Sequence, residues 1–391
     1  MHKEANAAVQ RAIDTALSEH GELGLQVAAY HQGRLVVDAW GGIARPQTGE
    51  PMDGNTLICP FSVTKAVTAT ALHIQAERGL VDYAAPIAKY WPEFGVHGKE
   101  RGTVYDALTH RLGLPFMPAD VDVQLMCDWA WMTTQLAKMH PLFEPGTRSA
   151  YMSLTFGWVI GEIVRRTDPK QRAFSRFVAE EICAPLAIDS LWLGAPESEW
   201  HRVAALDAPP EAPVTDPSYR PDNWRALAHP PAVQASQGAY ALPQVWGACL
   251  PGSGALMNAR SGARLFAMLA GRGTLDGVRL LSASRVSTFH APRPPVDWDM
   301  TLGAPHRGSV AGFWLRGTPN MAPVGTNPCV FGHPGFGGSV GWADPEEDFA
   351  MAIFHNRLYG GGSNPVGGKR GDGRALVMIA EAARRALGVG G

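Results

Sequence analysis

The sequence lacks the features that mark several classes of protein. It has no run of about eighteen apolar residues, so no transmembrane helix is predicted. The formal net charge is -2 and Lys and Arg form no cluster, so no nucleic-acid-binding surface is indicated. Residues 1–8 lack the apolar stretch of a secretory signal peptide. We therefore expect a cytoplasmic protein that binds neither nucleic acid nor a membrane.

Residues that form disulfides or hold metals and nucleotides are few or scattered. The cysteines are odd in number and show no C-x-x-C spacing, which favours free thiols in a reducing compartment: Cys59, Cys127, Cys183, Cys249 and Cys329. The 13 histidines form no H-x-x-x-H or H-E-x-x-H pattern, and no G-x-x-x-x-G-K-[ST] motif occurs. We expect no metal ion and no cofactor.

The most informative feature that is present is Ser62-Val63-Thr64-Lys65, at the start of a helix-like segment, 66–75. Residues three apart on a helix lie on one face, about one turn apart. A serine hydroxyl becomes a good nucleophile when a neighbouring base takes its proton. A lysine can act as that base if burial or nearby positive charge favours its neutral form. An ordinary surface Ser and Lys would show the same spacing, so the motif needs support elsewhere.

Two further segments supply that support. One is 146–153, which contains Tyr151-Met152-Ser153, and the other is the glycine-rich run 331–339, Phe-Gly-His-Pro-Gly-Phe-Gly-Gly-Ser. With these motifs the chain resembles the serine β-lactamase-like and penicillin-binding superfamily, most closely its family VIII carboxylesterases. That family has S-x-x-K, then Y-x-N or Y-x-S, then a K-T-G or H-x-G strand. Residues 108–115 are similar to its L-T-H-x-x-G-L-P segment and 251–256 to its glycine turn, and the resemblance runs from about residue 5 to 386.

The resemblance implies a role for each motif residue. Ser62 is expected to be the acyl-forming nucleophile, and Lys65 and Tyr151 to share the general-base work. Which of the two is deprotonated at rest stays open, because the pair can titrate together. Ser153 is expected to hydrogen-bond Lys65 or the substrate carbonyl. The oxyanion hole is expected to consist of the backbone N–H groups of Ser62 and Phe336.

The same resemblance places His333 and Gly335 beside the substrate. His333 stands where many relatives carry the lysine of K-T-G. A neutral imidazole holds a carboxylate less firmly than an ammonium does. This difference favours neutral esters over anionic β-lactams or peptides.

The order of the patterns indicates the architecture. With 46% hydrophobic and 18% charged residues, 391 residues can form a large core and more than one domain. Periodicity predicts a first helix, two strands around the turn 31–34, four late strands and a last helix: 5–19, 25–30, 35–40, 312–315, 329–331, 339–342, 349–354 and 374–387. Residues 60 to about 300 are mostly helical. Residues 207–235 read as a surface excursion beside the pocket and 360–373 as a linker.

We therefore expect an α/β (α+β) fold of the β-lactamase-like type, with an antiparallel sheet flanked by terminal helices and an inserted, mostly helical region. Residues 1–58 and 300–391 form the discontinuous sheet region in this prediction, and residues 59–299 form the helical region. The active site is expected in the cleft between them, a common place for ligand sites.

One competing motif uses a different serine. Residues 337–341 fit G-x-S-x-G, and Ser339 could be written as a triad with Asp344 and His355. That motif needs a strand-turn-helix context, whereas Ser339 begins an apolar strand. We therefore favour Ser62 over Ser339.

Three functions stay open at this point. The leading one is a serine hydrolase that cleaves carboxylic esters through an acyl-enzyme on Ser62. An acyltransferase, or a β-lactamase or D-amino-acid peptidase, would use the same scaffold, and a non-catalytic binding module is disfavoured by the intact motifs. The expected partner is a small-molecule ester, and self-association into a homo-oligomer is left open.

Overall fold

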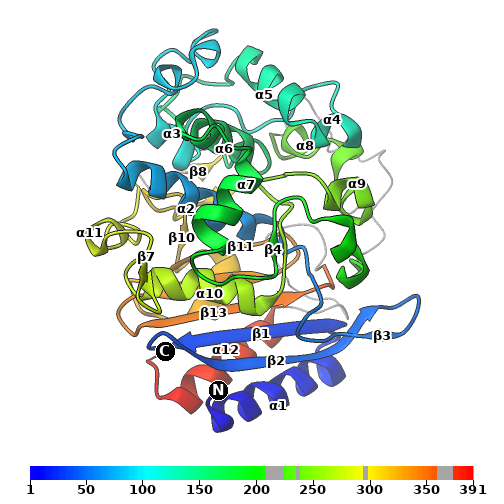
Figure 1. Ribbon diagram of the computed structural model, residues 1–391. Coiled ribbons are helices and arrows are strands. Elements are labelled where there is room, and N and C mark those ends of the chain that lie inside the picture. Colours follow the sequence, from blue (N-terminus) through cyan, green and yellow to red (C-terminus); the bar gives the residue numbers. More distant parts are fainter. Residues whose placement is uncertain (208–223, 235–237, 294–297, 359–372, 391) are drawn as a thin grey trace.

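Strands from both ends of the chain form one antiparallel sheet (Figure 1). The structure is a computed structural model that describes residues 1–207, 224–234, 238–293, 298–358 and 373–390. The sheet has seven strands in the order β10-β11-β12-β13-β1-β2-β3. Their bounds are β1 Gly24–His31, β2 Arg34–Arg45, β3 Glu50–Pro51, β10 Trp314–Leu315, β11 Phe331–Pro334, β12 Val340–Asp344 and β13 Phe349–His355.

The two ends of the chain meet where β1 pairs with β13. The register runs from Leu25 opposite His355 to His31 opposite Phe349. The β1–β2 hairpin closes at Gln32 and Gly33, whose φ angles of 50° and 69° are left-handed. Two left-handed residues match the twist of a tight hairpin, and glycine adopts that conformation without strain. The predicted hairpin is confirmed.

Side chains on β13 alternate between two hydrophobic cores. Ala350, Ala352 and Phe354 face the core that contains α2, whereas Met351 and Ile353 face the core that contains the terminal helices. This is the two-residue period of a strand. A strand buried on both faces is apolar throughout, which explains the unbroken hydrophobic run in the sequence.

Helices cover both faces of this sheet. Helices α1 Lys3–Glu19 and α12 Arg374–Leu387 lie together on one face, and α10 Ala259–Ala270 lies on the other (Figure 1). Both terminal helices end within a residue or two of their predicted bounds. The arrangement confirms the predicted fold class, an antiparallel sheet flanked by terminal helices with an inserted, mostly helical region.

The other labelled helices between β3 and β10 lie on the same side of the large sheet as α10 (Figure 1). These α-helices are α2 Thr64–Glu77, α3 Val104–Leu108, α4 Val123–Cys127, α5 Trp129–Lys138, α6 Thr155–Thr167, α7 Phe174–Val178, α8 Trp224–Ala228, α9 Pro243–Trp246 and α11 Ala283–Val286. Three two-stranded sheets accompany them: β4 Leu191–Trp192 with β5 Leu256–Met257, β6 Thr274–Leu275 with β7 Val278–Arg279, and β8 Trp298–Asp299 with β9 Ala304–Pro305.

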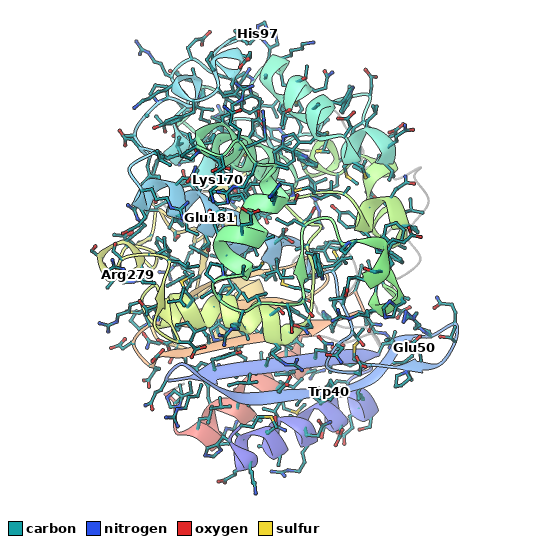
Figure 2. All side chains as sticks on the ribbon, in the orientation of Figure 1. Trp40, Glu50, His97, Lys170, Glu181 and Arg279 are labelled. Atoms are coloured by element: carbon teal, nitrogen blue, oxygen red, sulfur yellow. The ribbon has the colours of Figure 1, made fainter. Side chains whose placement is uncertain are left out.

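Helix α2 is the central helix of this region, and every residue from Thr64 to Ala76 is buried. An ion pair between Arg78, just after the helix, and Glu181 ties its C-terminal end to the surface. Figure 2 shows Glu181 next to Lys170, with His97 at the end of the molecule far from Trp40 of β2. Burial of α2 and its packing against α6 hold the residues at its start in place.

Some expectations concern segments outside the described residues. Most of 207–235 and of 360–373 falls there, although α8 and the turn Pro231–Val233 are described. We keep the boundaries at residues 58 and 300 as a proposal. No helix in the described ranges combines the length and apolar character needed to span a bilayer.

Candidate active site

Ser62 lies in a single 3-10 turn, Phe61–Val63, directly before α2, and its side chain is half-buried. The preceding Phe61 has a φ of 47°, an unfavourable backbone conformation for a residue with a side chain. Its ring packs against Tyr240 at 5.1 Å and Phe336 at 5.6 Å between centroids. Strain of this kind persists only where packing enforces it, and it is concentrated at functional sites.

Lys65 is completely buried and reaches three oxygen atoms. Its Nζ lies 3.0 Å from Oγ of Ser62, 2.5 Å from the backbone oxygen of Ser153 and 2.7 Å from that of Gly252. Burial lowers the pKa of Lys65 well below its usual value. A neutral amine has two N–H donors and one lone pair. The two carbonyl oxygens can accept the two N–H groups, which leaves the lone pair for the hydroxyl proton of Ser62.

Glycines allow the carbonyl of Gly252 to come this close. A Cβ atom on Gly157 in α6 would lie 2.0 Å from the backbone nitrogen of Gly252, and one on Gly252 would lie 2.5 Å from the backbone oxygen of Leu154. These two backbones therefore touch directly. Gly157 and the glycine turn that the sequence analysis places at 251–256 bring Lys65 and its acceptor together.

Replacing Gly157 by alanine is expected to cost about 1–3 kcal/mol of stability and to lower ester hydrolysis by at least tenfold, because the backbone at Gly252 must move away from Lys65. Gly161→Ala is the matched control in the same helix. Its Cβ would meet the tip of the Trp129 side chain at 2.7 Å, far from Lys65. We expect the control to lose stability and keep its turnover. Equal activities for the two variants at a temperature where both are folded would contradict this interpretation.

Tyr151 is held by a buried carboxylate. The backbone N–H of Tyr151 donates to Oδ1 of Asp299 at 2.9 Å, and the hydroxyl of Ser149 donates to Oδ2 at 3.2 Å. The N–H groups of Thr301 and Leu302 donate to the same Oδ1, each at 3.0 Å. Burial raises the pKa of Asp299 despite these donors. The carboxyl group therefore fixes the backbone that carries the tyrosine.

The phenol of Tyr151 lies beside both motif residues of α2. Its hydroxyl is close enough to Ser62 for that contact to lower its pKa, and its ring centroid is 5.1 Å from Nζ of Lys65. Burial raises the pKa of Tyr151 above its usual value, an effect that the contact with Ser62 only partly offsets. The two shifts have opposite directions. They favour a neutral Lys65 facing a protonated Tyr151 over an ammonium facing a tyrosinate.

Ser153 contributes its backbone rather than its hydroxyl. The expected contact with Lys65 is made by the carbonyl oxygen of Ser153. A backbone carbonyl can accept a hydrogen bond whatever side chain the residue carries. The Y-x-S pattern therefore indicates the position that contacts Lys65, but the contact does not depend on the serine side chain. A role for the hydroxyl toward a substrate stays a prediction.

The loop after β11 closes the other side of Ser62. A Cβ on Gly335 would lie 2.0 Å from the backbone oxygen of Pro60, so only glycine fits there. This contact brings Phe336 to the turn that carries Ser62. The backbone N–H groups of Ser62 and Phe336 have no hydrogen-bond partner within the described part of the chain. Their role as the oxyanion hole stays a prediction.

His333 lies on β11 opposite Gly341 and is completely buried. Its Nδ1 is 2.7 Å from the backbone oxygen of Pro334. Burial, with the nearby charge of Lys65 as a smaller cause, lowers the pKa of His333 well below its usual value. The imidazole is therefore uncharged at neutral pH. Direct contact between His333 and a substrate stays a prediction.

The alternative nucleophile, Ser339, is not placed for catalysis. It is buried at the start of β12, where its Oγ accepts a hydrogen bond from the backbone N–H of His355 at 3.2 Å. The imidazole of His355 faces Glu22 at 3.0 Å, and the carboxylate of Asp344 accepts from Asn327 at 3.1 Å. The triad written from the sequence is therefore not assembled.

Three neighbours of the site were not selected from the sequence. Asp299 accepts a hydrogen bond from the backbone of Tyr151. Tyr240 packs on Phe61 and shares a 2.5 Å hydrogen bond with Ser253. For His229, Lys65 is a minor cause of its lowered pKa. None belongs to a local motif, so only the folded arrangement reveals them.

The described residues contain no group of three or more His, Cys, Asp or Glu side chains placed to bind a metal ion. All five cysteines are free thiols.

Comparisons with known proteins agree with this geometry. The model of the Beta-lactamase family matches residues 9–372. The chain is 36% identical over 342 residues to the esterase/beta-lactamase LipL of Mycobacterium tuberculosis, covering 85% of this chain and 76% of that protein.

Two solved structures are similar over nearly the whole chain. A family VIII carboxylesterase has a TM-score of 0.87 and 30% identity, covering 99% of both chains. A penicillin-binding protein homologue from Caulobacter crescentus has a TM-score of 0.84 and 32% identity, again covering 99% of both. The chain therefore belongs to the beta-lactamase family, within a serine hydrolase superfamily in which its relatives include esterases.

Proposed function

We propose that this protein hydrolyses neutral carboxylic esters through an acyl-enzyme on Ser62. The observation that carries the proposal is the buried Lys65 amine, which meets two carbonyl oxygens and the Ser62 hydroxyl within 3.0 Å. A neutral amine so placed is a general base already in contact with its proton donor.

In the acylation step, Lys65 takes the proton of Ser62 while Oγ attacks the ester carbonyl carbon. The oxyanion that forms is stabilised by the free N–H groups of Ser62 and Phe336. When the bond to the leaving alkoxide breaks, Tyr151 donates its phenolic proton to that alkoxide. The phenolate then recovers a proton from the Lys65 ammonium, so the alcohol leaves with the former Tyr151 proton and the proton lost by Ser62 ends on Tyr151.

Deacylation repeats these roles with water as the nucleophile. Water attacks the acyl carbon and gives a proton to the Lys65–Tyr151 pair, which returns one to Oγ of Ser62 as the carboxylic acid leaves. An alcohol in place of water would give acyl transfer, with no difference in the residues that act. The ratio of hydrolysis to acyl transfer therefore depends on whether water or an alcohol attacks the acyl-enzyme.

The choice of neutral esters rests on His333. The position that carries a lysine in many relatives holds an uncharged, buried imidazole, so this strand offers no cation to a substrate carboxylate. A single such charge contact is worth about 1 kcal/mol or less at an exposed site. Weak turnover of anionic β-lactams is compatible with that magnitude.

A panel of p-nitrophenyl esters of increasing acyl length, with nitrocefin alongside, tests the proposal. We expect kcat/KM for at least one ester to exceed that for nitrocefin by more than tenfold. Parallel assays with methanol or butanol as acceptor measure acyl transfer as ester product. A preference for nitrocefin over every ester would overturn the assignment.

The pH dependence of kcat/KM is expected to show a broad maximum around neutrality. Activity should fall at low pH as Lys65 gains a proton, and at high pH as Tyr151 loses one. With ordinary pKa values, the combination of a neutral Lys65 and a protonated Tyr151 would be a minor species at every pH. Burial lowers the pKa of Lys65 and raises that of Tyr151, so this combination becomes the main species near neutral pH.

The profile should be recorded from about pH 5 to pH 10 with Ser62→Ala as the blank for spontaneous hydrolysis. Tyrosinate absorbance near neutral pH should be the same with and without Tyr151. A rate that instead rises with a tyrosinate signal absent from Tyr151→Phe would make Tyr151 the resting base.

A further inference from the structure

Three buried imidazoles lie close to the buried ring of Tyr151. The ring centroids of His110, His306 and His333 lie 4.6 Å, 6.3 Å and 6.3 Å from that of Tyr151. His110 and His306 are 6.4 Å apart, and Trp314 packs against both His306 and His333, at 4.4 Å and 5.5 Å. Each of the three imidazoles is at least 97% buried. None of them acts as an acid, a base or a nucleophile in the acylation and deacylation steps described above.

Hydrogen bonds at Nδ1 fix the tautomer of each neutral ring. The N–H of Met152 donates to Nδ1 of His110 at 3.2 Å, and a guanidinium N–H of Arg293 donates to Nδ1 of His306 at 3.4 Å. Both rings therefore carry their proton on Nε2. In His333, Nδ1 must donate to the carbonyl oxygen of Pro334, so its Nε2 is an acceptor. The cluster thus offers two donors and one acceptor.

All three Nε2 atoms are buried without a hydrogen-bond partner in the described part of the chain. A buried polar group without a partner is costly, and buried water commonly supplies about three such bonds at once. The pKa values of the three histidines are lowered, that of His306 to about 3, so charge does not satisfy them. A metal ion does not fit either, because two of the Nε2 atoms carry protons.

We propose that His110, His306 and His333 form a binding site for one water molecule behind Tyr151, and that this hydrated site positions Tyr151. The water accepts from Nε2–H of His110 and of His306 and donates to Nε2 of His333. The water fixes the orientation of His110, and Nδ1 of His110 accepts a hydrogen bond from the backbone N–H of Met152, the residue after Tyr151. With Asp299 on the N–H of Tyr151 itself, the backbone is then fixed on both sides.

The tautomers give a test that does not depend on activity. Long-range ¹H–¹⁵N correlation spectra of histidine side chains should show Nε2–H for His110 and His306 and Nδ1–H for His333. Single His→Gln variants assign the signals. A different tautomer at any of the three rings removes the donor and acceptor match and overturns the proposal. A crystal structure at high resolution should show one ordered water within about 3.2 Å of all three Nε2 atoms, and a dry cluster would also overturn it.

The kinetic test uses His306, which touches neither Ser62 nor Lys65 in the described contacts. His306→Gln can keep an N–H near the place of Nε2, whereas His306→Met fills the space without a donor. We expect His306→Met to lower kcat about threefold to tenfold with KM unchanged, because it removes the donor to the water and the acceptor of the Arg293 N–H. His306→Gln, whose amide can both donate and accept, should recover most of that loss. His140→Met, in the remote ring pair with His97, is the control and should match the parent enzyme.

This kinetic arm rests on the proposed function, and the spectroscopic arm does not. If no ester is turned over while the tautomers and the water are as described, the proposed function fails and the water site stands. Equal kcat for His306→Met and His306→Gln, with both folded, would show that His306 acts by packing alone and would end the positioning role.

Discussion

Ser62→Ala is expected to lower ester hydrolysis by about 10⁴-fold or more, because it removes the nucleophile that we propose forms the acyl-enzyme. Ser339→Ala is the matched control, since Ser339 is the other serine that fits a hydrolase motif in the sequence. Ser339 is buried and bonded to the backbone of His355, so its loss should cost about 1 kcal/mol of stability and leave substantial activity.

The two variants are compared by kcat/KM on one p-nitrophenyl ester, with thermal unfolding measured in parallel. Loss of activity in folded Ser339→Ala, with activity retained in Ser62→Ala, would reverse the assignment. The contrast is sharp because the two side chains differ in access and not in chemistry.

Lys65→Ala and Tyr151→Phe are each expected to lower turnover by about 10²–10⁴-fold, the usual range for loss of a general base or acid. The double variant should be little worse than the poorer single variant, because residues that act as one unit fail together. Tyr151→Phe keeps the ring contacts with His110 and Trp314, so its loss reports on the hydroxyl.

Lys65→Ala also opens a cavity, and Lys65→Met separates the two effects. Methionine fills most of the space and has no basic nitrogen, so it should restore stability without restoring turnover. A Lys65→Met enzyme with near-parent activity would show that the amine is not the base. A Tyr151→Phe enzyme with near-parent activity would show that Lys65 works without the phenol.

Local patterns predicted the parts of the fold that depend on local physics. The terminal helices follow from their apolar stripes, and the β1–β2 hairpin follows from Gln32-Gly33 between two apolar runs. The contact between Ser62 and Lys65 follows from helical spacing. The motif order, through the family resemblance, predicted that Tyr151 would join them.

Contacts between distant segments could not be read in the same way. The second carbonyl on Lys65 belongs to Gly252, 187 residues further along the chain. The carboxylate that anchors Tyr151 comes from Asp299, 148 residues away. Neither residue type is unusual. Close packing of two backbones at Gly157 and the buried position of Asp299 bring them to the site. Similarly, a Y-x-S pattern names a side chain, whereas the contact at Ser153 is made by the backbone.

Covalent labelling tests the central claim most directly. The protein is treated with a fluorophosphonate, digested, and analysed by mass spectrometry for the modified peptide. We predict a single adduct on Ser62, formed rapidly in the parent protein and strongly slowed in Lys65→Met. An adduct on Ser339, or a parent protein that stays unlabelled while it hydrolyses esters, would contradict an acyl-enzyme on Ser62.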